Sequence, residues 1–509
     1  MQHGGSICPE GNRVQAYDAG RTESRRGPLL MLCAVAALLF AILLVYSRTI
    51  AFAWDEGFHL LAAQLILAGK RPYLDFCYPQ APLYAYWNAL WMGLFGDTWR
   101  VAHAVSAVVT AGAILLAAEF LVARFPVAGW RLACAVAAAL AAGLNATVVG
   151  YGAIGQAYGL CLFLLVAAFR VSVAAVERAS PLWSAAAGFF AGAAVGSSLL
   201  TAAAAPVLLV WIPLHNRAGN RGAKLAAYLA GAAVPFLPLL WLFARSPHAV
   251  FFNLVLYQLR YRRVNWEDAT AHDLAVLTSW LVSSQPLLLA LLAALGLRFI
   301  ARMSGWDRAK RAEFYLCAWL ALAIGAELCA THPTFERYFI LVTPFLAILA
   351  AVGFHAAASR LYHPVRPMVP LAALALLLTV PLAKSVYQET AALSWRDLEA
   401  VARKIEEVTP PGGILWGDEH FHFLTRRPPP EGVEFSYAQV IDMPAAQAAP
   451  LHIVNLDELV RQATAGAFAT VATCEAEPEI QQMGLAQLYL HQAKIKSCTV
   501  FWDRAPARQ

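Results

Sequence analysis

The stretch of sequence that decides the fold is AWDEGFHLLAAQLILAGKRPYLDFCYPQAPLY, residues 53–84. It places an acidic pair, Asp55 and Glu56, immediately after the first apolar segment that is long enough to cross a bilayer. Apolar residues then recur with helical spacing up to Gly69, which predicts an amphipathic helix on the membrane surface. Asp55 would lie near the N-terminus of that helix, where the helix dipole favours a negative charge. A turn between two prolines then leads into a second apolar helix.

The composition of the whole chain supports a membrane protein. Of the 509 residues, 60% are hydrophobic and 14% are charged, and the mean hydropathy is +0.56. Soluble domains are about half apolar and about a quarter charged. These values exclude a single water-soluble domain, a disordered chain and a disulfide scaffold. The nine cysteines are scattered without a CxxC pair, so they do not predict a metal site or a thiol nucleophile.

About 11 apolar segments approach the length that a transmembrane helix needs. The pair between residues 182 and 214 is short enough to form one broken helix instead of two. The first segment is too long for a signal peptide, so we interpret it as a retained anchor behind a cytoplasmic leader, residues 1–27. The predicted spans are residues 28–47, 101–123, 131–149, 153–175, 182–199, 201–214, 225–244, 273–298, 313–330, 338–358 and 367–384.

Basic residues beside the spans indicate the orientation of the chain. Arg21, Arg25 and Arg26 precede the first span and place the N-terminus in the cytoplasm, and every second loop then carries a basic cluster. This basic excess lies in short loops, so it indicates topology and not a nucleic-acid-binding surface. The loops that fall outside are residues 50–99, 245–272 and 331–337, together with everything after residue 385.

The tail differs from the rest of the chain. Residues 386–509 carry 10 Lys and Arg against 16 Asp and Glu. A helical pattern over residues 397–408 ends at Pro-Pro-Gly-Gly. Short β-like runs follow at residues 414–416, 468–473 and 498–502. We therefore expect three parts: the leader, a transmembrane domain over residues 28–385 with a large first outer loop, and a small extramembrane α/β domain over residues 386–509.

One outer loop opposes the orientation rule. It holds Arg260, Arg262 and Arg263 among aromatic residues, on the side that basic residues usually avoid. An anionic ligand at the outer membrane face would compensate for three arginines there. The alternative is an interfacial helix that anchors to anionic lipid headgroups. The sequence leaves both interpretations open.

The motifs of residues 54–94 closely resemble those of the GT-C membrane glycosyltransferases. The resemblance rests on the Asp-Glu pair after the first span, the helix, the motif Gly-x-x-Pro-Tyr-x-Asp-Phe at residues 69–76 and the Pro-x-x-Pro-Leu turn. The bacterial branch that it resembles is related to protein O-mannosyltransferases, aminoarabinose transferases and lipopolysaccharide-core sugar transferases. A weaker similarity lies in Glu336-Arg337-Tyr338 and the proline that follows at residue 344.

The resemblance implies a polytopic α-helical protein of the bacterial inner membrane, with a GT-C-like body and its C-terminal domain in the periplasm. Such enzymes transfer a sugar from a polyprenyl-phosphate donor to an acceptor at the outer face, generally with inversion. The acceptor is a membrane lipid, an envelope glycan or a protein. Asp55 would be the catalytic base or would orient the acceptor, because a carboxylate can take the proton of a hydroxyl nucleophile. Glu56 and Asp75 are the further catalytic candidates.

The leaving group in this chemistry is a lipid phosphate, which needs positive charge where negative charge develops. The fork of an Arg side chain matches phosphate oxygens. One departure from the family increases the importance of the arginines, because relatives often have Lys-Pro-Pro-Leu where this chain has Gln80-Ala-Pro-Leu. The predicted phosphate-binding residues are Arg260, Arg262, Arg263 and Arg337.

The remaining candidates are substrate-binding residues, and each has a structural alternative. Asp55 could only cap the helix, Glu56 could be a solvated charge, and Asp75 could close a turn or bind a metal. His59 could be a structural hydrogen-bond partner, the tyrosines could belong to the interfacial aromatic belt, and Glu327 could be a packed protonated acid in a span. No metal-ligand spacing is distinctive, so a divalent metal stays an open alternative and no cofactor is predicted. The substrate-binding candidates are His59, Tyr73, Gln80, Tyr84 and Glu327.

Two rival functions come from other classes. A transporter of a lipid or solute would predict polar residues at mid-depth in several spans and an internal repeat, and neither pattern is clear. A catalytically inactive relative would act as an envelope scaffold through its tail. Gln80 favours this second rival, whereas the presence of Asp55 argues against it.

Overall fold

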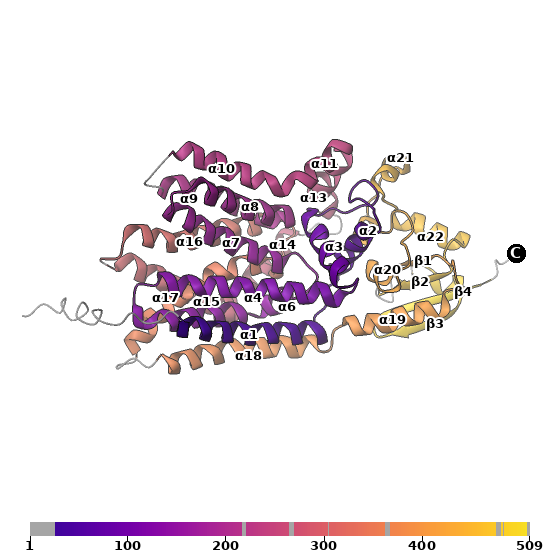
Figure 1. The fold of residues 1–509 in the computed structure, drawn as a ribbon. Helices are drawn as coiled ribbons and strands as arrows, with labels where there is room; N and C mark the ends of the chain where they lie inside the picture. The colour runs from indigo at the N-terminus through magenta and orange to yellow at the C-terminus, as the bar shows by residue number, and fades with distance from the viewer. Residues whose placement is uncertain are drawn as a thin grey trace, which may run out of the picture.

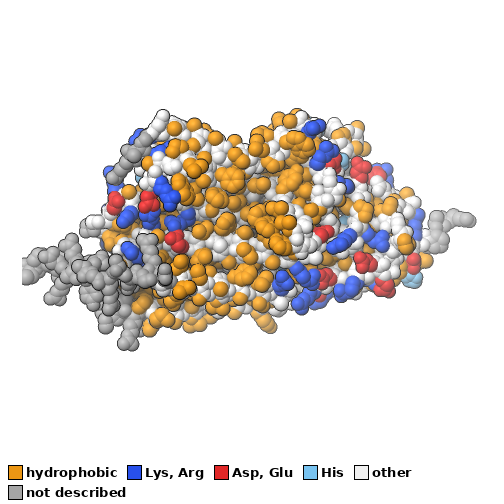
Figure 2. All heavy atoms as spheres, viewed as in Figure 1, with side chains coloured by type: hydrophobic (Ala, Val, Ile, Leu, Met, Phe, Trp, Pro, Cys, Tyr) orange, Lys and Arg blue, Asp and Glu red, His pale blue; other side chains and the backbone are white. Residues whose placement is uncertain are grey.

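The computed structural model describes residues 26–215, 220–263, 269–303, 305–361, 367–474, 480–481 and 483–505. The predicted leader lies almost entirely outside these residues. The described chain forms a body of helices that run side by side, with the C-terminal part at one end of the body (Figure 1). Hydrophobic side chains cover the visible face of this body, and charged side chains gather towards its two ends and over the C-terminal part (Figure 2).

Eight helical segments in the described residues are long and apolar enough to cross a membrane. They are helical because a chain in lipid must satisfy its backbone hydrogen bonds within each segment. A polytopic α-helical fold is thus confirmed, although the count of about 11 spans is not. The eight are α1 (Arg26–Thr49), α4 (Trp99–Arg124), α7 (Tyr158–Glu177), α10 (Arg221–Ala233) with η5 (Val234–Phe236) and α11 (Leu237–Arg245), α15 (Ser284–Arg302), α16 (Arg308–Ala330), η8 (Glu336–Val342) with α17 (Thr343–Leu361), and α18 (Met368–Glu389).

Four shorter helices occupy the remaining predicted spans. The segment between residues 182 and 214 is two helices and not one, because a 3₁₀ turn, η4 (Leu199–Thr201), separates them. Asn145 stops the predicted span 131–149, since its side chain accepts hydrogen bonds from two backbone N–H groups of the next helix. The helices are α5 (Arg131–Gly143) after η3 (Ala128–Trp130), α6 (Ala146–Tyr151), α8 (Pro181–Ser197) and α9 (Ala204–His215).

The outer loop before α15 is built from short helical pieces. The predicted span 273–298 is interrupted at Ser283, which lies between α14 (Ala269–Val282) and α15. Pro286 follows in the first turn of α15, where a residue without an N–H is tolerated. The pieces before α14 are α12 (Pro247–Phe251), the π-helix η6 (Phe252–Leu256), α13 (Tyr257–Leu259) and η7 (Tyr261–Arg263).

Close backbone contact between α15 and α17 fixes the position of the segment that precedes α17. A Cβ atom on Gly353 of α17 would lie 1.8 Å from the carbonyl oxygen of Leu292, and one on Gly296 of α15 would lie 2.2 Å from that of Leu349. Small residues let membrane helices approach this closely. As a result η8, which begins with Glu336 and leads directly into α17, is held at the end of a tightly packed helix pair.

The first outer loop is more enclosed than the sequence predicts. It contains α2 (Glu56–Leu67) and α3 (Leu83–Phe95), and nine of the twelve residues of α2 are buried. The predicted amphipathic surface helix is therefore wrong for α2. Its sequence is apolar on nearly every side, and such a helix belongs in a core. One core combines α2 with the C-terminal part, where Trp395 and Phe421 are buried.

The C-terminal part is an α/β unit with one four-stranded sheet in the order β1-β2-β4-β3. The pair β1-β2 is parallel and the other pairs are antiparallel. Three strands coincide with the predicted β-like runs, whereas β3 was not predicted because this edge strand is mostly exposed and polar. The strands are β1 (Leu415–Gly417), β2 (Thr470–Thr473), β3 (Tyr489–Ile495) and β4 (Cys498–Arg504).

Helices and one disulfide complete this unit. A reciprocal capping box between Ser394 and Asp397 starts the first helix, which agrees with the predicted helix over residues 397–408. A disulfide joins Cys474 after β2 to Cys498 of β4, and the sequence analysis did not predict it. The helices are α19 (Trp395–Val408), α20 (Glu419–Thr425), η9 (Ser436–Ala438), α21 (Ala445–Ala448), η10 (Ala449–Leu451), α22 (Leu456–Ala465) and α24 (Leu485–Leu488).

Candidate active site

Asp55 lies where three distant parts of the chain meet. It precedes the first residue of α2, and both of its carboxylate oxygens have a partner. Arg337 of η8 donates from Nη2 to Oδ2 over 2.9 Å. Tyr437 of η9 donates its phenol proton to Oδ1 over 3.0 Å. The membrane body and the C-terminal unit therefore each supply one donor to the same carboxylate.

Tyr437 keeps its proton in this arrangement. Burial and the charge of Asp55 both raise the pKa of the phenol above its usual value of 10.0. The phenol is thus the donor and the carboxylate is the acceptor of the hydrogen bond. Part of the side chain still reaches the surface, because 44% of Tyr437 is exposed.

Aromatic rings orient the guanidinium of Arg337. Its Cζ lies 4.3 Å from the ring centroid of Phe335 and 5.6 Å from that of Tyr338. A cation over an aromatic face is attracted by the negative face of the ring. Arg337 also has a buried Nε that has no hydrogen-bond partner within the described part of the chain. This guanidinium therefore pairs with Asp55 through one of its nitrogens.

A second arginine lies on the same tyrosine. Arg262 donates to the Tyr338 hydroxyl and, over 3.3 Å, to the Pro333 carbonyl, and its Cζ lies 5.8 Å from the Tyr338 ring. Two of the predicted phosphate-binding arginines, Arg262 and Arg337, are thus brought together around Tyr338. Arg260 is exposed at the end of α13, and the side chain of Arg263 lies outside the described residues.

Glu56 lies beside Asp55 in the chain but in a different environment. Its side chain is fully buried and each of its oxygens has two partners. Oε1 accepts from the backbone N–H of Ala53 over 2.9 Å and from the Trp395 indole over 3.3 Å. Oε2 lies 2.5 Å from His103 Nε2 and 2.7 Å from the backbone nitrogen of Gly155. A carboxylate with this many partners ties the outer loop to α4, to the segment before α7 and to the C-terminal unit.

Comparison with known proteins gives a structural match but no sequence match. Neither a family model nor a curated protein matches the sequence. The crystal structure of ArnT from Cupriavidus metallidurans bound to undecaprenyl phosphate has a TM-score of 0.66 and 15% identity to this chain, and the match covers 94% of this chain and 98% of ArnT. The apo structure of the same protein gives 0.62 and 16% over the same shares. AglB from Archaeoglobus fulgidus, in complex with an inhibitory peptide and a dolichol phosphate, gives 0.52 and 13% over 89% of this chain and 71% of AglB.

The chain has the GT-C fold. This confirms the fold predicted from residues 54–94 and from the many apolar segments. At these identities the match establishes the architecture, so the roles of individual residues rest on the geometry within this chain.

Asp75 forms a local ion pair. Its carboxylate accepts from Nε and Nη2 of Arg71 over 2.7 and 2.8 Å and from the Arg71 backbone N–H over 2.7 Å. The hydrogen bonds from the Arg71 side chain lower the pKa of Asp75. This arrangement favours the turn-closing alternative over a catalytic role.

Four of the predicted substrate-binding residues pack inside the first outer loop. His59 Nδ1 lies 2.8 Å from the Tyr78 hydroxyl, and its ring centroid is 5.1 Å from that of Tyr84. Burial lowers the pKa of His59 to about 3, so the ring is neutral at physiological pH. Tyr73 has a positive φ of 68° and donates to the backbone carbonyl of Gln80 over 2.5 Å. These contacts stabilise the conformation of the loop.

Glu327 in α16 contacts another helix. Its carboxylate accepts from the backbone N–H of Ala203 over 2.9 Å, directly before α9 begins. An acidic group at a helix N-terminus is favoured by the free N–H groups and by the helix dipole. The contact explains how a charged residue is accommodated in this span.

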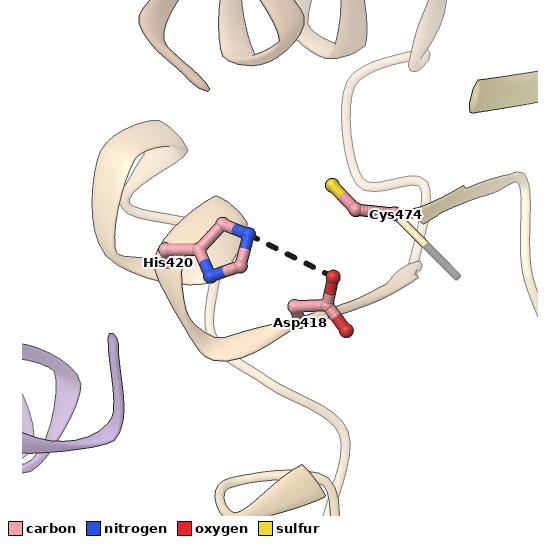
Figure 3. Close-up of side chains that lie close together, drawn as sticks. All are labelled: Asp418, His420 and Cys474. Atoms are coloured by element: carbon pink, nitrogen blue, oxygen red, sulfur yellow. Dashed lines mark ion pairs between the residues drawn. The ribbon is translucent and has the colours of Figure 1, made fainter. Parts of the chain in front are cut away.

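One cluster in the C-terminal unit has the residue types of a metal site. The side chains of Asp418, His420 and Cys474 place ligand-type atoms within 4.8 Å of one another, and His420 Nε2 lies 3.7 Å from Asp418 Oδ2 (Figure 3). However, the sulfur of Cys474 is bonded to Cys498. Two ligand side chains remain, fewer than the three or four that hold zinc in proteins. The cluster does not fit a metal site.

The sequence analysis did not identify Tyr437 as a site residue. It is separated from Asp55 by 382 positions and lies in a short 3₁₀ helix of the tail. No motif marks it. Tyr338, in contrast, belongs to the Glu-Arg-Tyr sequence that the analysis quoted, so a signal for it was present.

Proposed function

We propose that this protein is a glycosyltransferase that moves a sugar from a polyprenyl-phosphate donor to an envelope acceptor, with inversion and with Asp55 as the base. The observation that carries the proposal is the 2.9 Å contact between Asp55 and Arg337, which places a candidate base beside a candidate phosphate-binding cation. The GT-C neighbours add support, because ArnT is described with undecaprenyl phosphate and AglB with a dolichol phosphate.

The proposed reaction is a single displacement at the anomeric carbon of the donor sugar. The acceptor oxygen forms a bond to that carbon, and the acceptor proton passes to Asp55. The bond between the anomeric carbon and the phosphate oxygen breaks, and its electron pair leaves with the polyprenyl phosphate. Attack from the face opposite the leaving group inverts the anomeric configuration. A carboxylate within hydrogen-bond distance of the hydroxyl assists such a step by about 10²–10⁴-fold.

Positive charge is needed where the phosphate leaves. Arg337 and Arg262 flank Tyr338, so two guanidinium groups would lie beside the departing phosphate. Preorganised donors of this kind stabilise developing negative charge without reorganising during the reaction. These two arginines would bind the donor phosphate, for which relatives often have a lysine at the position of Gln80.

The place of the reaction follows from the topology. Basic clusters in alternate loops support an N-terminus in the cytoplasm, with the first outer loop and the C-terminal unit on the other side of the membrane. The resemblance of residues 54–94 implies that this membrane is a bacterial inner membrane and that the other side is the periplasm. Asp55 would then meet its substrates at the outer face, where the acceptor is a membrane lipid, an envelope glycan or a protein. A divalent metal is not required by this proposal.

The rival functions have less support. A transporter would need polar groups along a path through the spans. The candidate residues gather instead between the outer ends of helices and the C-terminal unit. An inactive scaffold would not need a carboxylate that both halves of the protein orient with charged and polar donors.

Donor turnover tests the proposal. Purified wild-type protein is mixed with a panel of polyprenyl-phosphate sugars and acceptor-containing membrane extract, and the release of polyprenyl phosphate and the transfer of labelled sugar are followed. We expect release coupled to transfer for at least one donor, with a product of inverted configuration. Release with no donor, from protein that is folded by thermal unfolding, would exclude the transferase and favour a transporter or a scaffold.

A further inference from the structure

Each oxygen of Asp55 already has one donor, so an acceptor hydroxyl must compete with that donor for the oxygen that it approaches. Arg337 holds Oδ2 and the Tyr437 phenol holds Oδ1. A general base must lie within about 2.6–3.2 Å of the hydroxyl that it deprotonates. The Tyr437 oxygen is 3.0 Å from Oδ1, which is the distance an acceptor hydroxyl would need. The phenol therefore occupies the place of the acceptor.

We propose that Tyr437 is a latch that an acceptor hydroxyl displaces. In the resting protein the phenol O–H fills the acceptor position on Oδ1 of Asp55. An incoming hydroxyl takes that position, and only then does Asp55 have a proton to accept. The inference rests on the proposed function and adds to it a part of the C-terminal unit that controls access to the base.

Of the two partners of Asp55, Tyr437 is the one that can leave. The bond from Arg337 joins two charges, and such hydrogen bonds are about twice as strong as neutral ones. Arg337 is also packed on two aromatic rings at the beginning of a buried span. Tyr437 is neutral, 44% exposed and lies in a helix of three residues. Its loss leaves the charge of Asp55 paired.

The backbone beside Tyr437 is anchored, so the latch stays close to the site after it opens. The carboxylate of Glu419, the first residue of α20, accepts from the backbone N–H of Ser436. Helix α20 in turn approaches α2 closely, since a Cβ on Gly57 would lie 3.2 Å from the His420 nitrogen. The ring of Tyr437 lies edge-on to Phe58, with centroids 6.2 Å apart. In the proposed latch, a rotation of the side chain frees Oδ1 while the backbone stays in place.

A latch of this kind would protect the donor from water. An unoccupied Asp55 could deprotonate water as well as an acceptor. The water oxygen would then bond to the anomeric carbon, the phosphate would leave with the electron pair, and the products would be free sugar and polyprenyl phosphate. Excluding water from reactive groups is a general task of active sites. With the phenol on Oδ1, an acceptor that binds well enough to displace it is favoured over water at the base.

The test compares Tyr437→Phe with the wild type. The variant keeps the ring and its packing but removes the hydroxyl. Polyprenyl phosphate release is measured with and without acceptor, and the acceptor KM, the donor KM and kcat are determined. The matched control is Tyr387→Phe, because Tyr387 is a 78% exposed tyrosine outside the candidate active site around Asp55. Thermal unfolding of each protein shows that folding is retained.

The latch predicts a specific pattern of changes. Acceptor-independent release should rise about tenfold, and the acceptor KM should fall by a similar factor. The reason is that the hydrogen bond from the phenol to Asp55 no longer competes with water or with the acceptor hydroxyl. The donor KM should stay close to the wild-type value, and the control should behave like the wild type. The double variant Asp55→Asn/Tyr437→Phe should lose the extra release.

Three results would overturn the latch and can be distinguished. If the wild type transfers sugar and Tyr437→Phe matches it in every parameter, the latch is wrong and the proposed function stands. If Tyr437→Phe lowers kcat and leaves acceptor-independent release unchanged, Tyr437 positions Asp55 and does not block it. If the wild type releases nothing from any donor with or without acceptor, the proposed function fails and the latch fails with it.

Discussion

Nη2 of Arg337 lies 2.9 Å from Oδ2 of Asp55. A cation at the start of a buried span therefore pairs with a carboxylate that directly precedes α2 in the first outer loop. The pair has two consequences in the proposed transferase. It orients the carboxylate towards the side from which Tyr437 approaches, and it places a guanidinium where a donor phosphate would arrive. A bound phosphate would contact Arg337 together with Asp55. The arginine would then neutralise less of the negative charge on the base.

Replacing Arg337 should impair use of the donor. Arg337→Lys keeps the charge but loses the fork that matches phosphate oxygens, so we expect the donor KM to rise about tenfold. Arg337→Met should lower kcat by about 10²–10³-fold, as the loss of one preorganised donor does in other enzymes. Initial rates at varied donor concentration give both values. Arg461→Lys, which changes a 76% exposed side chain on α22, is the control. A wild-type rate for Arg337→Met would remove Arg337 from the phosphate site.

Arg262 and Arg337 should act on the same phosphate. Both contact Tyr338, so the loss of one changes what the other can do. We expect Arg262→Ala to raise the donor KM, and we expect the double variant with Arg337→Lys to lose less activity than the product of the two single effects. A double-mutant cycle on kcat/KM measures this coupling. Independent effects that multiply would show that the two arginines serve different groups.

Glu56 should contribute to stability more than to chemistry. Its removal by Glu56→Ala leaves buried donors on Trp395 and His103 without an acceptor. A buried donor left without an acceptor costs about 1–3 kcal/mol. We therefore expect a large fall in the thermal unfolding temperature, and a smaller one for Glu56→Gln, which keeps one oxygen. Activity per folded molecule should survive in Glu56→Gln. An unchanged unfolding temperature together with lost activity would make Glu56 a catalytic residue instead.

Glu434 should make stability depend on pH. It is buried, and burial raises the pKa of its carboxyl from 4.5 to about 7. Between these two values the native protein keeps a proton that the unfolded chain releases, so stability is greatest below pH 4.5 and is lost as the pH rises through 7. Glu434→Gln removes the ionisation and should stabilise the protein by about 2–3 kcal/mol at pH 8. Little change is expected at pH 4.5. Unfolding temperatures of both proteins at the two pH values check this, and equal curves at both would contradict it.

The features of the fold that could be predicted from the sequence are those with local signals. Apolar runs predicted the long helices, and the turn and capping residues around α19 predicted its end. The helix boundaries at Asn145 and Ser283 were missed, because a single cap or a proline was outweighed by the hydropathy around it. The polar edge strand β3 was missed for a related reason, since its pairing with β4 supplies order that its own composition does not show.

The residues of the candidate site also differ in whether a local sequence signal marks them. Asp55 and Arg337 lie in motifs that resemble those of a known family, so both could be named from the sequence. The burial of Glu56 could not, because its partners come from four separate parts of the chain. Tyr437 could not be identified either, since tertiary packing brings η9 to Asp55, as in the contact between Phe435 and Phe58.

The most direct test of the central claim is the effect of Asp55→Asn on donor turnover. Polyprenyl phosphate release and sugar transfer would be measured for wild type, Asp55→Asn and the control Asp457→Asn, which changes an exposed residue at the start of α22. We predict that Asp55→Asn lowers transfer by at least about 10²-fold with the protein still folded and still able to bind donor. The control should match the wild type. Transfer by Asp55→Asn at the wild-type rate would contradict the account, because the carboxylate that Arg337 and Tyr437 share would then not be the base.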